Sequence, residues 1–432
     1  MKQSQRVVIT GMGTVNPIGS NISDFRKNLK NNIGWSKFLN EELMQKHWIE
    51  HNNIGVTIAA PIMDDLDKRS EDELWLNRKE RKRMSKLMKI FTLSANEAIN
   101  DSGLDIEKVL RKKIYFATSM WWFDSITRWI ETWMSNDLKN ACRVFSIPTG
   151  IISTQVFNLS QKYKFWYKSP QPFTEACAAW LYGAKAAFQE IRDNLIDVAL
   201  LWWWDTMVSS NGLRWFRATN ALSTRDDLSA SRPWDADADG FVMADWGWFL
   251  VFESLDHAKM RNAEIIAEVF GFGDRGDHYS ITSPHPNGIG IQWAIWDLLE
   301  SSGLSIEEID AWWLHRTSTW GDVSEMKWVM RFLKDHDMTW WFFAWKSRTG
   351  HTLAWATILS LIEWIIYMQD NFINPMKNLN TLHPEVKALL NKHYIDQLTL
   401  DSARSVKIIK FIINGLAFGG YNIAWAFWEY KE

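Results

Sequence analysis

The sequence has few cysteines, no excess of charge of either sign and no long uninterrupted hydrophobic run. Its two cysteines, Cys142 and Cys177, exclude a disulfide framework in a chain of 432 residues and indicate a reducing compartment. The 48 Lys and Arg residues against 51 Asp and Glu give a net charge of −3, so the overall charge does not predict a nucleic-acid partner. The apolar stretch 352–368 contains Glu363, which favours an interior helix over a membrane span.

Targeting and cofactor motifs are missing as well. The first residues, MKQSQRVVITGMG, lack the charged and then apolar pattern of a secretory signal, so we expect a cytoplasmic protein. No CxxC pair, HExxH motif or P-loop occurs, so the motifs give no support for metal or nucleotide chemistry. The composition, 47% hydrophobic and 23% charged, is that of a globular protein with room for two or three domains.

Strands and helices are expected to alternate along the chain. β-branched and apolar runs predict strands at 6–13, 113–119, 197–204, 249–253, 265–272, 311–314, 406–413 and 423–429. Helical patterns cover 71–102, 178–193, 290–302, 322–334 and 352–368. The alternation is typical of α/β sheets covered by helices on both faces. A similar order begins again after about residue 260, which predicts two similar halves.

Cys177 precedes a helical stretch in the segment TEACA. A cysteine at a helix amino terminus meets the positive end of the helix dipole, which favours the reactive thiolate. A buried structural cysteine is the commoner alternative, and the residue alone does not decide between the two.

Two histidines also stand where strands are expected to end. His315 follows an apolar run and opens a polar loop, which is where α/β proteins place site residues. His351 lies in KSRTGH, between a strand-like and a helix-like segment. The glycine-bearing loop at 414–422 can aim backbone N–H groups at an oxyanion, or it can be a tight connection only.

Together these segments identify a family resemblance that runs nearly from end to end. The chain resembles the β-ketoacyl-acyl carrier protein synthases of the elongating type II branch, within the thiolase-like superfamily. Eight segments in the same order carry the resemblance: RVVITGMGTVNPIGS, TEACA, ALSTRDD, SRPWDADADGFVM, GDHYSITSPHPNG, HRTSTWGDVSE, KSRTGH and FGGYN. The resemblance implies a thiolase-like α/β fold of two duplicated halves, 1–258 with the nucleophile and 259–432 with the two histidines. Each half would hold a five-stranded mixed sheet, in α-β-α-β-α layers.

The resemblance also implies roles for individual residues. Cys177 matches the nucleophile that accepts an acyl chain from a carrier-protein thioester. His315 and His351 match the two histidines that assist malonyl decarboxylation. Lys346 matches the lysine that orders the site electrostatically.

Two further residues are carried over from the resemblance. Glu325 matches a glutamate expected to support Lys346. Phe418 matches a gating phenylalanine whose backbone N–H, with that of Cys177, would form the oxyanion hole.

The activity that the resemblance implies is a decarboxylating Claisen condensation in fatty acid biosynthesis. An acyl-carrier-protein thioester and malonyl-carrier protein would give a 3-oxoacyl-carrier protein, CO2 and free carrier protein, through an acyl-cysteine. No metal or other cofactor would be needed. Alternatives are a specialised polyene or polyketide ketosynthase, a non-catalytic chain-length partner subunit, which would lack the nucleophile, and a cysteine hydrolase.

The partners implied are an acidic acyl carrier protein and a second copy of the chain. A cationic helix would steer the carrier protein, with the candidate docking residues Arg78, Lys79, Arg81, Lys82, Arg83 and Lys86. An ordinary solvated helix face is the alternative for these residues. A homodimer is expected through sheet edges near 197–204, with a heterodimer as the other possibility.

Several residues depart from the family pattern. Arg316 stands where a glycine is usual, and Glu175 stands where a small residue is usual. Tryptophan is unusually frequent, at 29 residues against 22 glycines. Indoles replace small residues in several places, which predicts overpacking, at Trp202, Trp203, Trp204, Trp246, Trp248 and Trp355. Either neighbouring residues have become smaller or the sequence has been altered from a natural parent.

Overall fold

The computed structural model describes residues 4–46, 49, 54–118, 134, 156–206, 208–319, 321–336, 341–343, 346–352, 356–398 and 402–431. Cys142 and Trp355 lie outside these residues. Among the described helices, none combines the length and the apolar character needed to cross a bilayer.

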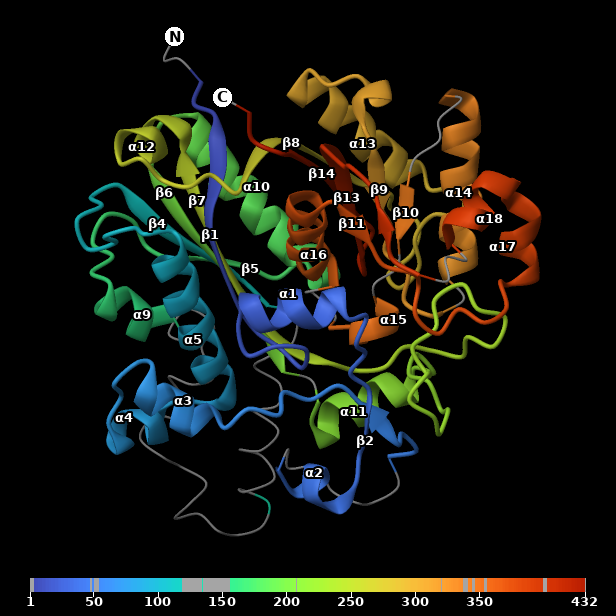
Figure 1. Ribbon diagram of the computed structural model, residues 1–432, viewed down its shortest axis with the longest axis horizontal. Helices are drawn as coiled ribbons and strands as arrows, with labels where there is room; N and C mark the ends of the chain where they lie inside the picture. The colour runs from blue at the N-terminus through green and yellow to red at the C-terminus, as the bar shows by residue number, and fades with distance from the viewer. Residues whose placement is uncertain are drawn as a thin grey trace.

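A mixed sheet of ten strands forms the centre of the described structure (Figure 1). Its strand order is β10-β9-β13-β14-β8-β1-β7-β6-β4-β5. The first half of the chain supplies β1 (Val7–Val15), β4 (Lys112–Ala117), β5 (Gln171–Phe173), β6 (Val198–Thr206) and β7 (Asp245–Ser254). The second supplies β8 (Ala267–Gly276), β9 (Ala311–Trp313), β10 (Trp341–Phe343), β13 (Lys410–Ala417) and β14 (Tyr421–Trp428). The sequence did not indicate β5, whereas β10 falls in the strand-like segment expected before KSRTGH.

The two sets of five strands repeat one topology. In the first set, β4 pairs in parallel with β5 and β6, and β6, β7 and β1 follow in antiparallel order. In the second set, β9 pairs in parallel with β10 and β13, and β13, β14 and β8 follow in antiparallel order. The sets join where β1 meets β8 over three antiparallel residue pairs. The expected duplication of five-stranded mixed sheets is confirmed. The division at residues 258 and 259 stays a prediction.

Helices fill the space between the two sets of strands and cover their outer faces. Figure 1 shows α10 (Ala179–Arg192) and α16 (Ala356–Asp370) in the middle, where α10 contacts strands of both sets. On the outside, α5 (Lys86–Asp101) packs on β1 and β7, and α13 (Ile289–Ser302) packs on β8 and β14. This arrangement gives the expected α-β-α-β-α layers.

The other helices and short strands lie around these layers. The helices are α1 (Ile22–Lys30), α2 (Glu41–Lys46), α3 (Leu66–Asp72), α4 (Arg78–Arg83), α9 (Phe157–Lys162), α11 (Ser210–Ala218), α12 (Leu255–Met260), α14 (Gly321–His336), α15 (Lys346–Thr349), α17 (Pro384–Leu389) and α18 (Lys392–Leu398). Short 3-10 turns occur at η2 (Ala176–Ala178) and η3 (Ile306–Glu308). Two small two-stranded sheets pair β2 (Lys37–Phe38) with β3 (Ile58–Ala59), and β11 (Phe372–Ile373) with β12 (Arg404–Ser405).

Glycines in β1 allow α5 to lie directly against the strand. A Cβ atom at Gly11 would collide with the backbone oxygen of Ala98, and one at Gly13 with that of Ser94. The β-branched run that forms the strand therefore needs its glycines for close packing against the helix.

Two expectations about this half are wrong. The predicted helix at 71–102 is interrupted, because Asn77 and Ser85 cap the new helices α4 and α5 through their side chains. The strand near 197–204 is not a sheet edge, because β6 is hydrogen bonded to β4 on one side and β7 on the other. The edge strand of the first set is β5, whose only pairing in the described sheet is with β4.

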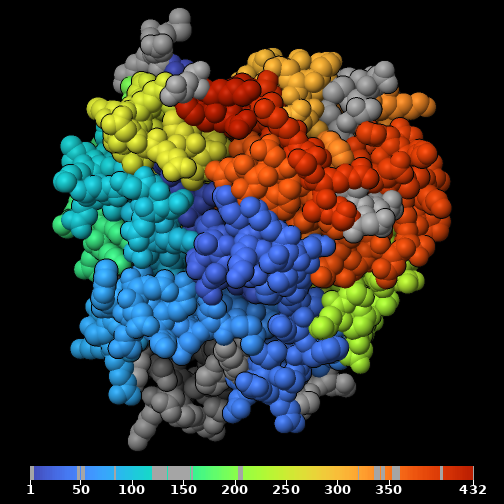
Figure 2. Space-filling model, in the orientation of Figure 1, coloured from blue at the N-terminus to red at the C-terminus, as the bar shows by residue number. Residues whose placement is uncertain are grey.

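Arg348 of α15 forms a buried ion pair with Glu363 and a hydrogen bond to the amino-terminal segment. Arg348 donates to Glu363 of α16 at 2.8 Å and to the side-chain oxygen of Asn32 at 2.6 Å. Both charged side chains are only 2 to 3% exposed. Figure 2 shows the blue surface of the amino-terminal segment beside the orange-red surface of the carboxyl-terminal part. The hydrogen bond to Asn32 therefore ties the amino-terminal segment to the helix that begins at Lys346.

We expect Arg348→Met to lower the free energy of unfolding by about 3 to 5 kcal/mol, because it leaves the Glu363 carboxylate buried without its cation. Chemical denaturation measures the change. Lys327→Met, which removes an exposed ion pair with Glu385, is the matched control and should have a much smaller effect. Equal losses in the two variants would show that burial of the Arg348 pair is energetically unimportant.

Candidate active site

Cys177 lies in a tight turn at the amino end of α10. The 3-10 turn Ala176–Ala178 follows β5 and leads directly into the helix. Ala176 has a φ of +45°, a conformation that is costly for residues other than glycine and is often found at functional sites. The half-buried cysteine meets the positive end of the helix dipole, as the sequence predicts, which favours its thiolate.

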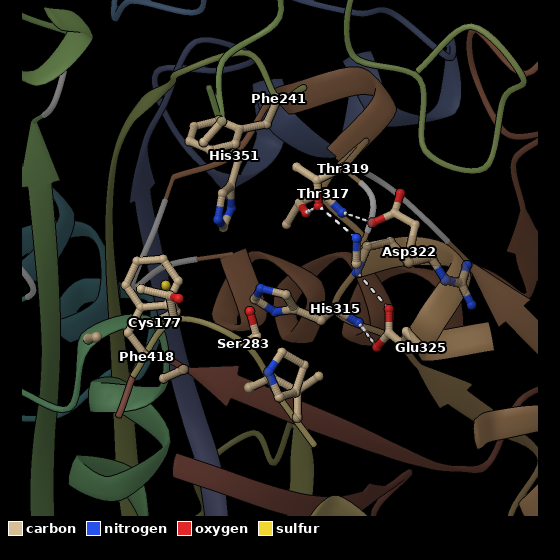
Figure 3. Close-up of a pocket in the computed structure, with 18 of the residues that line it drawn as sticks. Cys177, Phe241, Ser283, His315, Thr317, Thr319, Asp322, Glu325, His351 and Phe418 are labelled. Atoms are coloured by element: carbon tan, nitrogen blue, oxygen red, sulfur yellow. Dashed lines mark hydrogen bonds between the residues drawn. The ribbon is translucent and has the colours of Figure 1, made fainter. Parts of the chain in front are cut away.

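A cavity of about 420 Å³ opens beside Cys177, a size typical of small-molecule sites. Figure 3 shows Cys177, His315 and His351 around this space, with Phe418 next to the cysteine. The loop and first turns of α14 supply one wall, from His315 to Glu325. The structure thus brings together all the sequence-predicted site residues of the two halves except Lys346, which is buried and does not line the cavity.

The two histidine rings face one another nearly at right angles. Their centroids are 5.7 Å apart with an interplanar angle of 89°. Burial holds the pKa of each imidazole well below its usual value, and the charge of Lys346 lowers both further. Both rings are therefore neutral near pH 7. Each Nδ1 is buried and has no hydrogen-bond partner within the described part of the chain.

His351 is held by backbone contacts and by an aromatic ring. Its N–H donates to the carbonyl of Val242 at 2.7 Å, and its carbonyl accepts from Ala244 at 3.2 Å. The ring of Phe241 meets the imidazole edge to face, with centroids 4.8 Å apart. This packing fixes the direction in which the imidazole enters the cavity.

Two carboxylates of α14 hold the loop of His315. Glu325 accepts the N–H groups of His315 at 2.6 Å and Arg316 at 3.0 Å. Asp322 accepts those of Thr317 at 2.7 Å and Ser318 at 2.9 Å. Four consecutive backbone donors are thus satisfied by two side chains that lie one turn apart on the helix. Burial raises the pKa of Asp322 to about 6.

Lys346 starts α15 and is fully buried. Burial lowers the pKa of its amine to about 7, although the negative charges of Glu325, Asp322 and Cys177 oppose the shift. The expected link between Glu325 and Lys346 is thus electrostatic, whereas the hydrogen bonds described for Glu325 go to the backbone. A charge on Lys346 near neutral pH depends on these carboxylates.

The comparisons with known proteins agree with this geometry. The family model described as "Beta-ketoacyl synthase, N-terminal domain" matches residues 4–258. The model of the corresponding C-terminal domain matches residues 266–380. The chain belongs to the β-ketoacyl synthase family. A Coxiella burnetii protein named 3-oxoacyl-(acyl-carrier-protein) synthase 2 is 30% identical over 429 residues, which cover 97% of each chain.

Two solved structures confirm the fold class of this synthase. The ishigamide ketosynthase/chain length factor has a TM-score of 0.85 at 22% identity, covering 99% of this chain and 100% of that chain. A chain from the complex of a type II polyketide acyl-carrier protein with its ketosynthase has a TM-score of 0.83 at 20% identity, with the same coverage. Both likenesses show the thiolase-like fold alone.

Arg316 adopts the backbone conformation of the glycine that is usual in the family. Its φ is +31°, in the region that favours glycine. Its side chain is buried, with the guanidinium carbon 3.2 Å from the ring centroid of Trp234. Burial holds the pKa of this guanidinium well below its usual value, while Glu325 and Asp322 raise it. The loop backbone donates its hydrogen bonds to Glu325 and Asp322 with this long cation in place.

Glu175, the other departure near Cys177, has a mild consequence. Burial raises the pKa of Glu175, which reduces the charge that would oppose the thiolate two residues away. Phe418 is exposed at the turn between β13 and β14 and borders the cavity beside Cys177.

Within the described ranges, no group of three or more His, Cys, Asp or Glu side chains is arranged to hold a metal ion.

The basic segment of this synthase is only partly available to a partner. Arg81 forms an ion pair with Glu71 at 2.8 Å, and Lys86 with the buried Asp245 at 2.5 Å. Arg78 and Lys79 are exposed on α4. The side chains of Lys82 and Arg83 lie outside the described ones.

Asp322 and Phe241 are site residues that the sequence did not single out. Both lie in segments that carried the family resemblance, but neither type is a nucleophile or base in the expected chemistry. The signal for Asp322 was its spacing from Glu325, since residues three apart share a helix face. The contact of Phe241 with His351 joins residues more than a hundred positions apart, so no local pattern predicts it.

The tryptophans differ in how well they fit. The rings of Trp246 and Trp248 stack with centroids 5.9 Å apart, at an ordinary separation. Trp202 and Phe91 are crowded, since their ring centroids are only 3.0 Å apart. The predicted overpacking is therefore present at Trp202, while the side chains of Trp203 and Trp204 lie outside the described ones.

We expect Phe91→Ala to destabilise the protein less than Phe252→Ala. Both rings are buried, and a Phe→Ala change in a core usually costs about 3 to 5 kcal/mol. Because removing Phe91 also relieves crowding, which is worth about 1 to 3 kcal/mol, its loss should be smaller. Chemical denaturation of both variants tests this, and an equal or larger loss for Phe91→Ala would show that Trp202 is not overpacked.

We expect the free energy of unfolding of the wild type, minus that of Lys346→Met, to increase as the pH rises from 7 to 10. The pKa of Lys346 falls from 10.5 to about 7 on folding, so the folded state binds fewer protons than the unfolded chain over this range. Stability then rises with pH, by on the order of 3 kcal/mol. Urea titrations at both pH values measure the difference. The exposed Lys108→Met is the control, and a pH-independent difference for Lys346→Met would contradict the shift.

Proposed function

We propose that this protein is a β-ketoacyl-acyl carrier protein synthase that lengthens an acyl chain by two carbons. An acyl-carrier thioester and malonyl-carrier protein would give 3-oxoacyl-carrier protein, CO2 and free carrier protein. The observation that carries the proposal is the convergence of Cys177, His315 and His351 on one cavity, with Lys346 buried behind them. The name of the Coxiella burnetii relative agrees with it.

In the first step, the Cys177 thiolate attacks the carbonyl carbon of the acyl thioester. The bond from that carbon to the carrier sulfur breaks, and the acyl group stays on Cys177 while the carrier leaves as a thiolate that takes up a proton from water. The α10 dipole stabilises the attacking thiolate without a dedicated base. The backbone N–H groups of Cys177 and Phe418 would bind the oxyanion of the tetrahedral intermediate.

In the second step, the malonyl thioester loses CO2 when the bond to its carboxylate carbon breaks. The electron pair moves onto the thioester, and negative charge develops on its carbonyl oxygen. Neutral imidazoles can donate hydrogen bonds to that oxygen, which suits the lowered pKa of His315 and His351. The resulting carbanion attacks the acyl carbon on Cys177, and the carbon–sulfur bond breaks to release the 3-oxoacyl product.

The proposed partners follow from charge and from the sheet edge. Arg78 and Lys79 are the exposed cations through which α4 could attract an acidic carrier protein, while Arg81 and Lys86 are engaged in ion pairs. A chain with this fold was solved in complex with an acyl-carrier protein. A homodimer would form through β5, the edge strand of the first set. The cytoplasmic location stays a prediction.

Intact-protein mass spectrometry tests the function one step at a time. Mixed with an acyl-carrier-protein thioester, the wild type should gain one acyl group, and Cys177→Ala should gain none. His315→Ala and His351→Ala should still accept the acyl group, because neither is needed for the first step. On addition of malonyl-carrier protein, they should condense about 100-fold more slowly than the wild type, since each removes a donor to the developing charge.

The outcomes separate the alternatives. A folded wild type that takes no acyl group would overturn the synthase proposal and favour the non-catalytic partner subunit. An acyl group that is released only as free acid would favour a hydrolase. Repeated condensation without intervening reduction would favour the polyketide alternative.

A further inference from the structure

A second, smaller hollow lies next to the cavity of Cys177. Its volume is about 60 Å³, which is room for more than one water molecule. Its lining includes the polar side chains of Asp235 and His383, and it reaches the surface at Ala236, which is exposed. We call this hollow the polar recess. Thr319 and Asp322 line both the recess and the large cavity, so the two spaces are neighbours.

The contact between Arg316 and Trp234 lies at the boundary of the two spaces. Arg316 lines the large cavity and Trp234 lines the polar recess. The guanidinium carbon stands 3.2 Å from the ring centroid, and both residues are 1% exposed. A cation stacked on an indole at this distance leaves no room for water between them. The pair therefore joins the lining of the cavity to the lining of the recess, and we call it the wall.

Both members of this wall have a strained backbone. The φ of Arg316 is +31° and that of Trp234 is +62°, in the region that favours glycine. Such strain persists only where the surroundings hold the conformation, and it is common at functional sites. Here Glu325 binds the N–H of Arg316 at 3.0 Å, and the carbonyl of Trp234 accepts the N–H of His383 at 2.7 Å. Two separate hydrogen bonds thus anchor the backbone of the two residues whose side chains meet.

We propose that the Arg316–Trp234 contact is a barrier that keeps water of the polar recess away from the acyl group on Cys177. This inference rests on the proposed function. In the reaction it prevents, the oxygen of a water molecule bonds to the acyl carbon, the carbon–sulfur bond breaks, and the products are the free carboxylic acid and the Cys177 thiol. The acyl-enzyme must avoid this reaction until malonyl-carrier protein arrives, so exclusion of water preserves the intermediate.

Arg316→Gly is the decisive variant because it opens the wall without straining the backbone. Glycine accepts a positive φ freely, and the N–H that Glu325 binds is retained. Two conservative variants should keep the wall. Arg316→Lys places a cation over the ring, and Trp234→Phe places a ring under the guanidinium.

The experiment follows the acyl-enzyme over time by intact-protein mass spectrometry, after free acyl-carrier protein has been removed and with no malonyl thioester present. Arg316→Gly should lose its acyl group as free acid about tenfold faster than the wild type. In H2-18O, that acid should carry one 18O atom. With malonyl-carrier protein present, the ratio of free acid to 3-oxoacyl product should rise, and Arg316→Lys should restore it toward the wild-type value.

The results distinguish this inference from the proposed function. If the wild type accepts no acyl group, the proposed function fails before the barrier is tested, and the inference falls with it. If the wild type is acylated and Arg316→Gly keeps its acyl group as long, the barrier is wrong and the function stands. A slower condensation in Arg316→Gly without more free acid would assign Arg316 to the positioning of His315 and overturn the barrier.

Discussion

The candidate site depends on the way two carboxylates of α14 bind the backbone after β9. Asp322 and Glu325 accept four consecutive N–H groups, from His315 to Ser318. This contact fixes the ring of His315 at the cavity and holds Arg316 and Ser318 at positive φ, +31° and +65°. It also places two negative charges near Lys346, which keep part of its charge in a buried position. The hydrogen bonds and the charges of these two carboxylates therefore set the geometry and the electrostatics of the site.

The carboxylates of Asp322 and Glu325 also explain how buried cations are tolerated so close to the histidines. Burying an unpaired ammonium or guanidinium group is very costly, and pairing with nearby anions offsets part of that cost. Here Arg316 and Lys346 share the carboxylates of Asp322 and Glu325. The remaining positive field reaches both imidazoles and lowers their pKa, in the same direction as burial. The partial charge of Lys346 and the neutral state of the two imidazoles thus depend on each other through the charge of Lys346.

Local sequence could predict the elements that carry the site residues, but not all the contacts between distant segments. The strand-then-loop pattern at His315 and the helix after Cys177 are local signals, and both are confirmed. The position of β6 in the sheet interior depends on pairing with β4 and β7, which lie 80 residues before and 40 residues after it, so composition could not reveal it. The break in the helix at 71–102 had a local signal in its capping residues Asn77 and Ser85, which the run of basic residues obscured. The wall of Arg316 and Trp234 had no local signal.

The many tryptophans affect the packing of the core more than the lining of the cavity. Among the described residues that line the cavity, Trp328 is the only tryptophan. The crowded ring of Trp202 packs instead against Phe91 of α5, on the outer side of the first set of strands. Close-packed interiors transmit crowding to their neighbours, but the lining of the cavity comes from the cysteine turn, the end of α11, the loop at Phe241, the ends of β13 and β14, and loops and helix ends of the second half. The crowding at Trp202 therefore does not involve a residue of the cavity lining, where the residues proposed for chemistry lie.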